Sequence, residues 1–133
     1  MIYEFCAENV TLLEKAMEAG ARRIELCDNL AVGGTTPSYG VTKAAVELAA
    51  NYDTTIMTMI RPRGGDFVYN GMEIAIMLED IRLTAQAGSQ GVVFGALTAD
   101  KKLDKPNLEK LIAASEGMEI VFHMAFDELG DED

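Results

Sequence analysis

Two arginines and two glycines follow one strand-like stretch and form the turn best suited to holding a ligand. The run Arg61-Pro62-Arg63-Gly64-Gly65 comes directly after the largely apolar residues 55–60. Because proline disfavours helical backbone in the residue before it, Arg61 is expected to leave the strand in an extended conformation. Guanidinium groups beside open backbone N–H groups suit a carboxylate or a phosphate. The turn therefore predicts an anion site, and the alternative is a tight turn whose arginines pair with the chain's own acids.

A second candidate site rests on the two cysteines, Cys6 and Cys27. Each ends a similar four-residue pattern, Tyr3-Glu4-Phe5-Cys6 and Ile24-Glu25-Leu26-Cys27. Consecutive strands of a parallel sheet usually lie side by side, so both cysteines are expected on one face. Cu(I) prefers thiolate and thioether ligands, and Met57 or Met59 could add a thioether. The alternative is that the cysteines are small buried hydrophobic residues.

A third set of residues could act as acids and bases. Glu25 and His123 are the predicted acid–base pair, and Asp127 is expected to orient His123 or to react itself. Two plainer alternatives stay open: Glu25 forms a salt bridge with Arg61, and His123 is a hydrogen-bonded core residue. Asp66 is expected to cap the arginine turn.

Strands and helices alternate along the chain and determine where these residues lie. Strands are expected at residues 2–7, 23–27, 55–60, 91–97 and 119–126. Helices are expected after a cap at Asn9 or Thr11 and up to Gly20, and at residues 41–51, 71–87 and 107–116. Strict alternation of this kind indicates a parallel α/β sheet. The candidate residues then gather at or beyond the carboxyl ends of different strands, where barrels and open α/β sheets build their sites.

Composition limits the kinds of partner. The 133 residues suffice for one domain, 1–133, and 49% of them are hydrophobic. A net charge of −11 argues against nucleic acid or an anionic membrane as partner. No apolar run is long enough to span a bilayer, and the first residues lack the pattern of a signal peptide. We therefore expect a cytoplasmic protein with reduced thiols.

Several of these segments together resemble the CutC copper homeostasis family. They are Ile24-Glu25-Leu26-Cys27, Gly33-Gly34, Thr36-Pro37-Ser38, Arg61-Pro62-Arg63-Gly64-Gly65-Asp66-Phe67, Val93-Phe94-Gly95, Phe122-His123 and Ala125-Phe126-Asp127. The resemblance covers essentially the whole chain. It implies a cytoplasmic TIM-barrel-like protein linked to copper tolerance, with Cys6 and Cys27 as Cu(I) ligands. It differs at Met124, where members of the family usually have arginine.

Length is the larger departure from the family. A full (β/α)₈ barrel needs about 200–250 residues, whereas this chain offers about four β/α units and a fifth strand. We therefore expect an incomplete TIM-barrel-like fold whose edge strands favour a homo-oligomer. Cu(I) binding needs only the first strands and is the preferred function. The alternatives are an enzyme that acts on a small anionic ligand, or an inactive remnant of a barrel.

Overall fold

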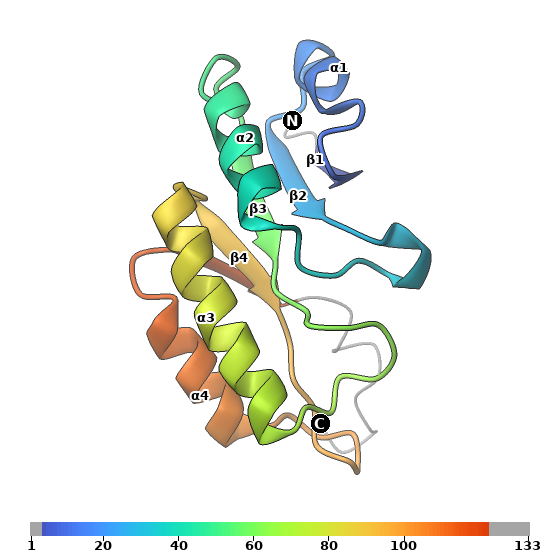
Figure 1. Ribbon diagram of the computed structural model, residues 1–133, viewed down its shortest axis with the longest axis vertical. Helices are drawn as coiled ribbons and strands as arrows, with labels where there is room; N and C mark the ends of the chain where they lie inside the picture. Colours follow the sequence, from blue (N-terminus) through green and yellow to red (C-terminus); the bar gives the residue numbers. More distant parts are fainter. Residues whose placement is uncertain (1–3, 123–133) are drawn as a thin grey trace.

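A single parallel sheet with helices packed along one of its faces forms the core of the protein (Figure 1). The computed structural model describes residues 4–122. The strands are β1 (Glu4–Glu8), β2 (Arg23–Cys27), β3 (Thr55–Met59), β4 (Gly91–Phe94) and β5 (Glu119–Phe122). The helices are α1 (Leu13–Glu18), α2 (Tyr39–Ala49), α3 (Gly71–Ala87) and α4 (Lys105–Ala114), with a short 3₁₀ turn, η1 (Leu30–Val32). The spatial order β1-β2-β3-β4-β5 follows the chain order, as predicted for a TIM-barrel-like β/α fold.

The starts of the helices follow from local side-chain chemistry, with one exception. Asn70 accepts a hydrogen bond from the Glu73 N–H, and the Glu73 carboxylate accepts one from the Asn70 N–H, so α3 begins with a full capping box. Ser38 and Asp104 cap α2 and α4, which therefore begin two residues earlier than predicted. The expected cap of the first helix is wrong: the cap position is Leu12, in left-handed backbone and without a capping side chain.

Two strands are shorter than the apolar pattern predicts. β3 ends at Met59 and β4 at Phe94, because the chain leaves the ladder after these residues. The Leu97 N–H, for example, donates to the Phe67 carbonyl oxygen at 2.8 Å rather than to a strand. The parts of the first and last predicted strands at residues 2–3 and 123–126 lie outside the described residues.

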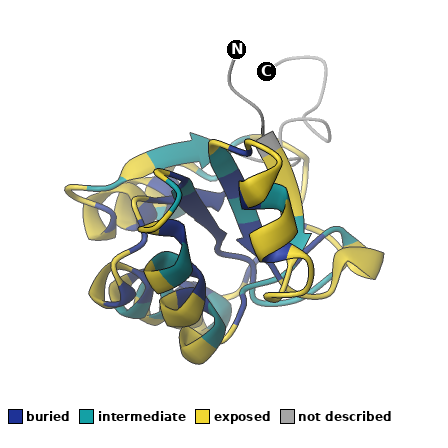
Figure 2. Ribbon diagram, turned by 90° about the horizontal axis from the view of Figure 1, so that it is seen from above, coloured by how far each residue is buried: buried dark blue, intermediate teal, exposed yellow. Residues whose placement is uncertain are grey.

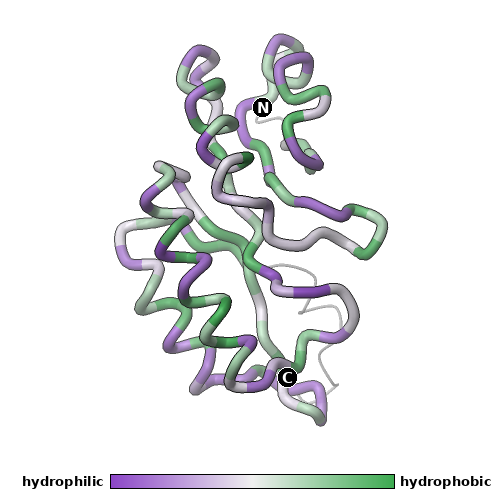
Figure 3. Tube along the Cα trace, viewed as in Figure 1, coloured by the Kyte–Doolittle hydropathy of each residue, from purple (hydrophilic) through white to green (hydrophobic). Residues whose placement is uncertain are grey.

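The two faces of the sheet have different surroundings. Figure 2 colours the residues along the ribbon by burial, and Figure 3 colours them along the chain trace by hydropathy. On one face, Ile24, Leu26 and Ile56 pack against helices α1 and α2, and Val92 and Phe94 pack against α3 and α4. The opposite face, called the inner face here, carries a second small cluster of buried residues: Cys27, Met57, Met59 and Val93. Residues alternate between these faces along each strand, so the parity of a residue decides which cluster it joins.

None of the helices between residues 4 and 122 combines the length and apolar character needed to cross a membrane.

Candidate functional site

The sheet register brings the two cysteines to the same face of neighbouring strands. Cys6 lies opposite Glu25, and Cys27 lies opposite Glu8. Paired residues of adjacent strands point to the same side of the sheet, so both thiols belong to the inner face, one diagonal step apart. The shared face predicted from the repeated four-residue pattern is therefore confirmed.

The environments of the two thiols differ sharply. Cys6 is exposed on the edge strand β1, whereas Cys27 is buried, with 2% of its surface exposed. The Cys27 thiol donates to the Ala7 carbonyl oxygen at 3.6 Å. Burial, helped by the nearby Cys6, Glu8, Glu25 and Asp28, raises the pKa of Cys27 to about 11. Cys27 is thus a protonated thiol near neutral pH unless a cation displaces its proton.

Two methionine sulfurs share the inner face with Cys27. Met57 pairs with Glu25 across β2 and β3. Two residues further along each strand, Met59 lies beside Cys27 on the same face. A methyl group added to Gly34 would lie 3.3 Å from the Cys27 sulfur and 3.6 Å from the end of Met59. The loop after β2 therefore closes directly over Cys27 and Met59. This grouping supplies one buried thiol and adjacent thioethers, which are soft ligands.

Among the described residues, no group of three or more His, Cys, Asp or Glu side chains has the arrangement of a metal site. The soft donors in this part of the chain are the thiols of Cys6 and Cys27 and the thioethers of Met57 and Met59. Such a donor set suits Cu(I) rather than zinc, which takes four nitrogen, sulfur or oxygen ligands.

Arg61 is buried just beyond the end of β3, with 4% of its surface exposed. Its guanidinium donates to the carbonyl oxygens of Val32 at 2.7 Å, Gly34 at 3.1 Å and Gly65 at 2.7 Å. It also stacks over the Phe67 ring, 4.7 Å from the centroid. Arg61 thereby ties the loop after β2 to the turn after β3. Of its three guanidinium nitrogens, Nε alone has no hydrogen-bond partner among the described residues.

Arg63 is held by the beginning of α3 and by its own turn. Its Nε donates to the Glu73 carboxylate at 2.6 Å, and its Nη2 donates to the Val68 carbonyl oxygen at 2.7 Å. The hydrogen bond from Arg63 lowers the pKa of Glu73, and the same contact raises the pKa of Arg63. The guanidinium lies over the Tyr69 ring, 5.1 Å from its centroid. The interpretation of an arginine paired with the chain's own acids describes Arg63 well.

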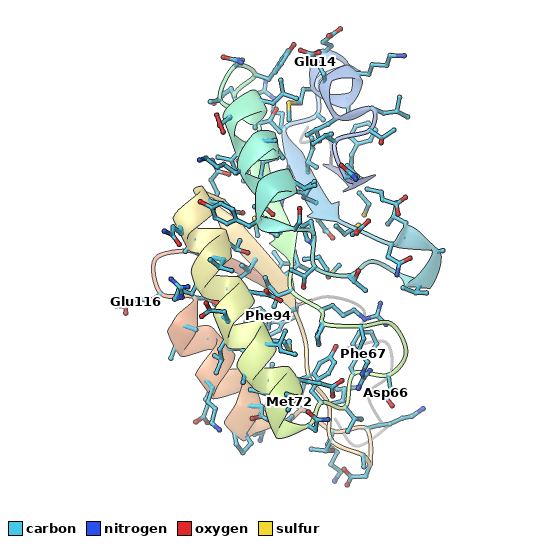
Figure 4. The ribbon with its side chains drawn as sticks, in the orientation of Figure 1. Glu14, Asp66, Phe67, Met72, Phe94 and Glu116 are labelled. Carbon is cyan, nitrogen blue, oxygen red and sulfur yellow. The ribbon has the colours of Figure 1, made fainter. Side chains whose placement is uncertain are left out.

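The remaining residues of the turn have mainly conformational roles. Asp66 accepts from the Val68 N–H at 3.1 Å, so the prediction that it caps the turn is confirmed. Figure 4 labels Asp66 and Phe67 in this turn and Met72 at the start of α3. A methyl group on Gly64 would lie 2.9 Å from the Val32 side chain, and Gly65 has φ +93°. Among the described residues, no carbonyl oxygen accepts a hydrogen bond from the N–H groups of Gly64 and Gly65.

The predicted acid–base residues are only partly within the described chain. Glu25 is half-buried on the inner face, opposite Cys6 and Met57 on its two neighbouring strands. His123 and Asp127 lie outside the described residues, as does Met124. Their assignment as an acid–base pair with Glu25 therefore stays a prediction.

Sequence reasoning missed the residues that hold the two arginines. Phe67 and Tyr69 follow Arg61 and Arg63 by six residues each, and each ring lies under its arginine. The equal spacing is not a signal by itself, because six residues of extended chain span about 20 Å and the contacts depend on the turn at Gly64 and Gly65. Glu73 could have been found through the Asn70-x-x-Glu73 pattern, which is the sequence signature of a capping box. The partners of Arg61 in the loop after β2 are backbone carbonyl oxygens, so no side-chain type in the sequence predicts them.

Fold and site together define the class: a TIM-barrel-like parallel β/α protein with its polar residues at the carboxyl ends of the strands. The crystal structure of the CutC protein of Streptococcus agalactiae superposes with a TM-score of 0.95 at 48% identity, covering 100% of this chain and 63% of its own. A phosphonomutase-type protein of Burkholderia cenocepacia, at 15% identity and a TM-score of 0.61, shares the fold alone.

The model of the CutC family matches residues 1–133. The CutC protein of Streptococcus pyogenes serotype M6 is 54% identical over 129 residues, 97% of this chain and 62% of that protein. That of Enterococcus faecalis is 52% identical over 132 residues, 99% of this chain and 63% of that protein. The chain belongs to the CutC family, and it spans less than two thirds of the length of these relatives.

Proposed function

We propose that this chain serves copper homeostasis in the cytoplasm by holding Cu(I) between Cys6 and Cys27. The Streptococcus agalactiae relative is described as a copper homeostasis protein. The observation that carries the proposal is the register of β1 and β2, by which both thiols face the inner side of the sheet, where Cys27 clusters with Met57 and Met59. A reducing compartment keeps such thiols available as ligands.

Met59 is the thioether best placed to assist. It belongs to the same buried cluster as Cys27, and Gly34 closes over both side chains. Cu(I) favours sulfur ligands. The acidic neighbours Glu8, Glu25 and Asp28 disfavour the thiolate of Cys27, and the same negative charges attract a cation to this position. When bound, the metal would replace the Cys27 proton, so uptake should strengthen as pH rises through the neutral range.

An anaerobic titration of Cu(I) against a chromophoric chelator tests the proposal. Cys6→Ser and Cys27→Ser should each abolish stoichiometric uptake, and Met59→Leu should weaken uptake about tenfold or more without abolishing it. Met72→Leu is the matched control, because Met72 is a 76% exposed methionine on α3. Equal uptake by the native chain and the double cysteine variant would contradict the proposal and leave the thiols as core residues.

A second candidate function is binding of a small phosphate- or carboxylate-bearing molecule at Arg61, Arg63, Gly64 and Gly65. The observation in its favour is that the N–H groups of Gly64 and Gly65 donate to no carbonyl oxygen of the described residues. Copper binding is preferred because the donors of both arginines are largely used by carbonyl oxygens and by Glu73. If the anion site is the function, phosphate should protect the native chain from thermal unfolding, and a variant that removes Arg61 should lose this protection.

A further inference from the structure

The loop after β2 is closed at its base and forms a small body of its own. Asp28 and Thr35 exchange two backbone hydrogen bonds, at 2.9 and 2.8 Å, so the two ends of the loop lie side by side. Within the loop, the Gly34 N–H donates to the Asn29 carbonyl oxygen at 3.2 Å. We call residues 28–35 the lid, which Figure 1 shows between β2 and α2. Its adjacent ends and internal hydrogen bonds are those of a compact surface loop.

Little apolar packing holds the lid against the rest of the molecule. The 3₁₀ turn η1 within it contributes no buried residue, and Leu30 and Val32 are both exposed. Gly34 is the buried part of the lid, and it lies directly over Cys27 and Met59. A segment with few buried apolar contacts opens at a much lower cost in free energy than the whole fold does.

Arg61 supplies the strongest fastening between the lid and the rest of the chain. Its guanidinium donates to the Val32 carbonyl oxygen at 2.7 Å and to the Gly34 carbonyl oxygen at 3.1 Å, and a third hydrogen bond holds it to the turn after β3. Hydrogen bonds from a charged donor are stronger than those between neutral groups. A further fastening is neutral on the side of the lid: the Leu30 N–H donates to the Glu8 carboxylate at 3.2 Å.

We propose that Arg61 is the latch of this lid, and that local opening of the lid gives access to the buried thiol of Cys27. Arg61 is then a positioning residue, because it acts on the thiol through the carbonyl oxygens of Val32 and Gly34. A neutral side chain at position 61 leaves these oxygens without their donor, so the open state gains population. The passage of Cu(I) through the open lid rests on the function proposed above, whereas access of any other thiol reagent does not.

Two other routes to Cys27 predict different behaviour. Global unfolding exposes most of the chain, so a rate of thiol reaction that depends on it rises steeply with urea. Opening of the lid exposes little surface, so a rate that depends on it is nearly independent of urea. A route along the inner face past Cys6 is insensitive to the side chain at position 61.

Labelling of the Cys6→Ser chain with iodoacetamide at one fixed pH, followed by mass spectrometry, measures access to Cys27 without any metal. We expect a labelling rate that is independent of urea at low concentrations and that rises about tenfold or more in Arg61→Met. Arg61→Lys restores a charged donor and should bring the rate part of the way back. Leu111→Ala is the matched control, because Leu111 is buried in the cluster beneath α3 and α4. It lowers the stability of the whole fold and should leave the labelling rate without urea within about twofold of the native rate.

Three results would overturn the proposal. They are labelling of Arg61→Met at the native rate, a native rate that rises steeply from the lowest urea concentrations, and equal acceleration by Arg61→Met and Leu111→Ala. Anaerobic Cu(I) uptake by the native chain separates the lid from the copper function. A latch that controls labelling in a chain without Cu(I) uptake supports the lid and contradicts the copper proposal alone.

Discussion

Cys27 is a buried thiol on a strand, surrounded by acidic groups, and this position couples it to the stability of the fold. Its pKa of about 11 in the folded protein exceeds the ordinary value of 9.0 because burial, and then Cys6 and the nearby carboxylates, disfavour the thiolate. The folded state therefore keeps a proton that the unfolded chain loses above pH 9. The resulting stability is fully present below pH 9 and is lost as pH rises from 9 to 11.

We expect the free energy of unfolding to fall by at most about 2–3 kcal/mol between pH 8 and pH 11 through this thiol. Urea titrations at a series of pH values measure the fall. Cys27→Ala should remove the part that begins near pH 9. The part that begins near pH 10 should remain, because burial also raises the pKa of Tyr69, to about 12. Identical pH profiles for both proteins would show that Cys27 is not the titrating group.

Arg61 is the residue that joins two loops, and its replacement should be costly. Arg61→Met keeps the apolar stem but leaves the carbonyl oxygens of Val32, Gly34 and Gly65 without their donor. We expect a loss of roughly 2–4 kcal/mol in the free energy of unfolding, measured in urea. Arg82→Met is the control, since Arg82 is exposed on α3 and pairs with Glu79. It should change stability by less than about 0.5 kcal/mol. Equal effects of the two changes would contradict the joining role of Arg61.

At the scale of elements, the contact between β3, β4 and β5 depends on a residue without a side chain. A methyl group on Gly91 would lie within 2.6 Å of the Glu119 carbonyl oxygen and of the Met57 side chain. The methionine could adjust, but the backbone of β5 could not move without losing its pairing with β4. Met57 therefore occupies, on the inner face, the space that Gly91 leaves free.

Gly91→Ala should accordingly lower the free energy of unfolding by about 1–3 kcal/mol or more. Gly71→Ala is the matched control, because nothing lies within 4 Å of a methyl group there and the residue begins α3. It should leave stability unchanged or raise it by about 0.5 kcal/mol. Thermal or urea unfolding of the two variants side by side decides the question, and a neutral Gly91→Ala would mean that β5 pairs differently from the register described.

At the scale of the whole molecule, β1 is the first strand in the order of the described sheet and so lies at its edge. Among the described residues, β1 pairs with β2 alone, and Phe5 and Leu12 are exposed on and beside this strand. Such an edge tends to pair with another chain unless something covers it. We therefore expect the isolated chain to self-associate at micromolar concentration, and Leu12→Asp to shift it toward monomer. Light scattering over a dilution series measures this, and a strict monomer in the native chain would count against it.

How far the sequence predicts the molecule differs between local and long-range features. The alternation of periods two and 3.6 predicts the order of strands and helices, and the helix predicted at residues 71–87 agrees with α3. The repeated Glu-x-Cys pattern was enough to place both cysteines on one face, because parity and chain-order pairing follow simple rules. The periodicity of a segment and the parity of its residues depend on positions only a few residues apart, which can be read from the sequence.

Only the tertiary structure decided which cysteine is buried and what Arg61 holds. Cys6 and Cys27 have similar sequence neighbours, yet among the described residues only Cys27 lies on a strand paired on both edges and under the loop at Gly34. The guanidinium of Arg61 finds two of its three acceptors 27 and 29 residues earlier in the chain, on backbone carbonyls that every residue possesses. Side-chain types encode which segments form strands and helices. The partner of a buried donor is set by which loops the sheet register brings together, and that is a property of the folded chain.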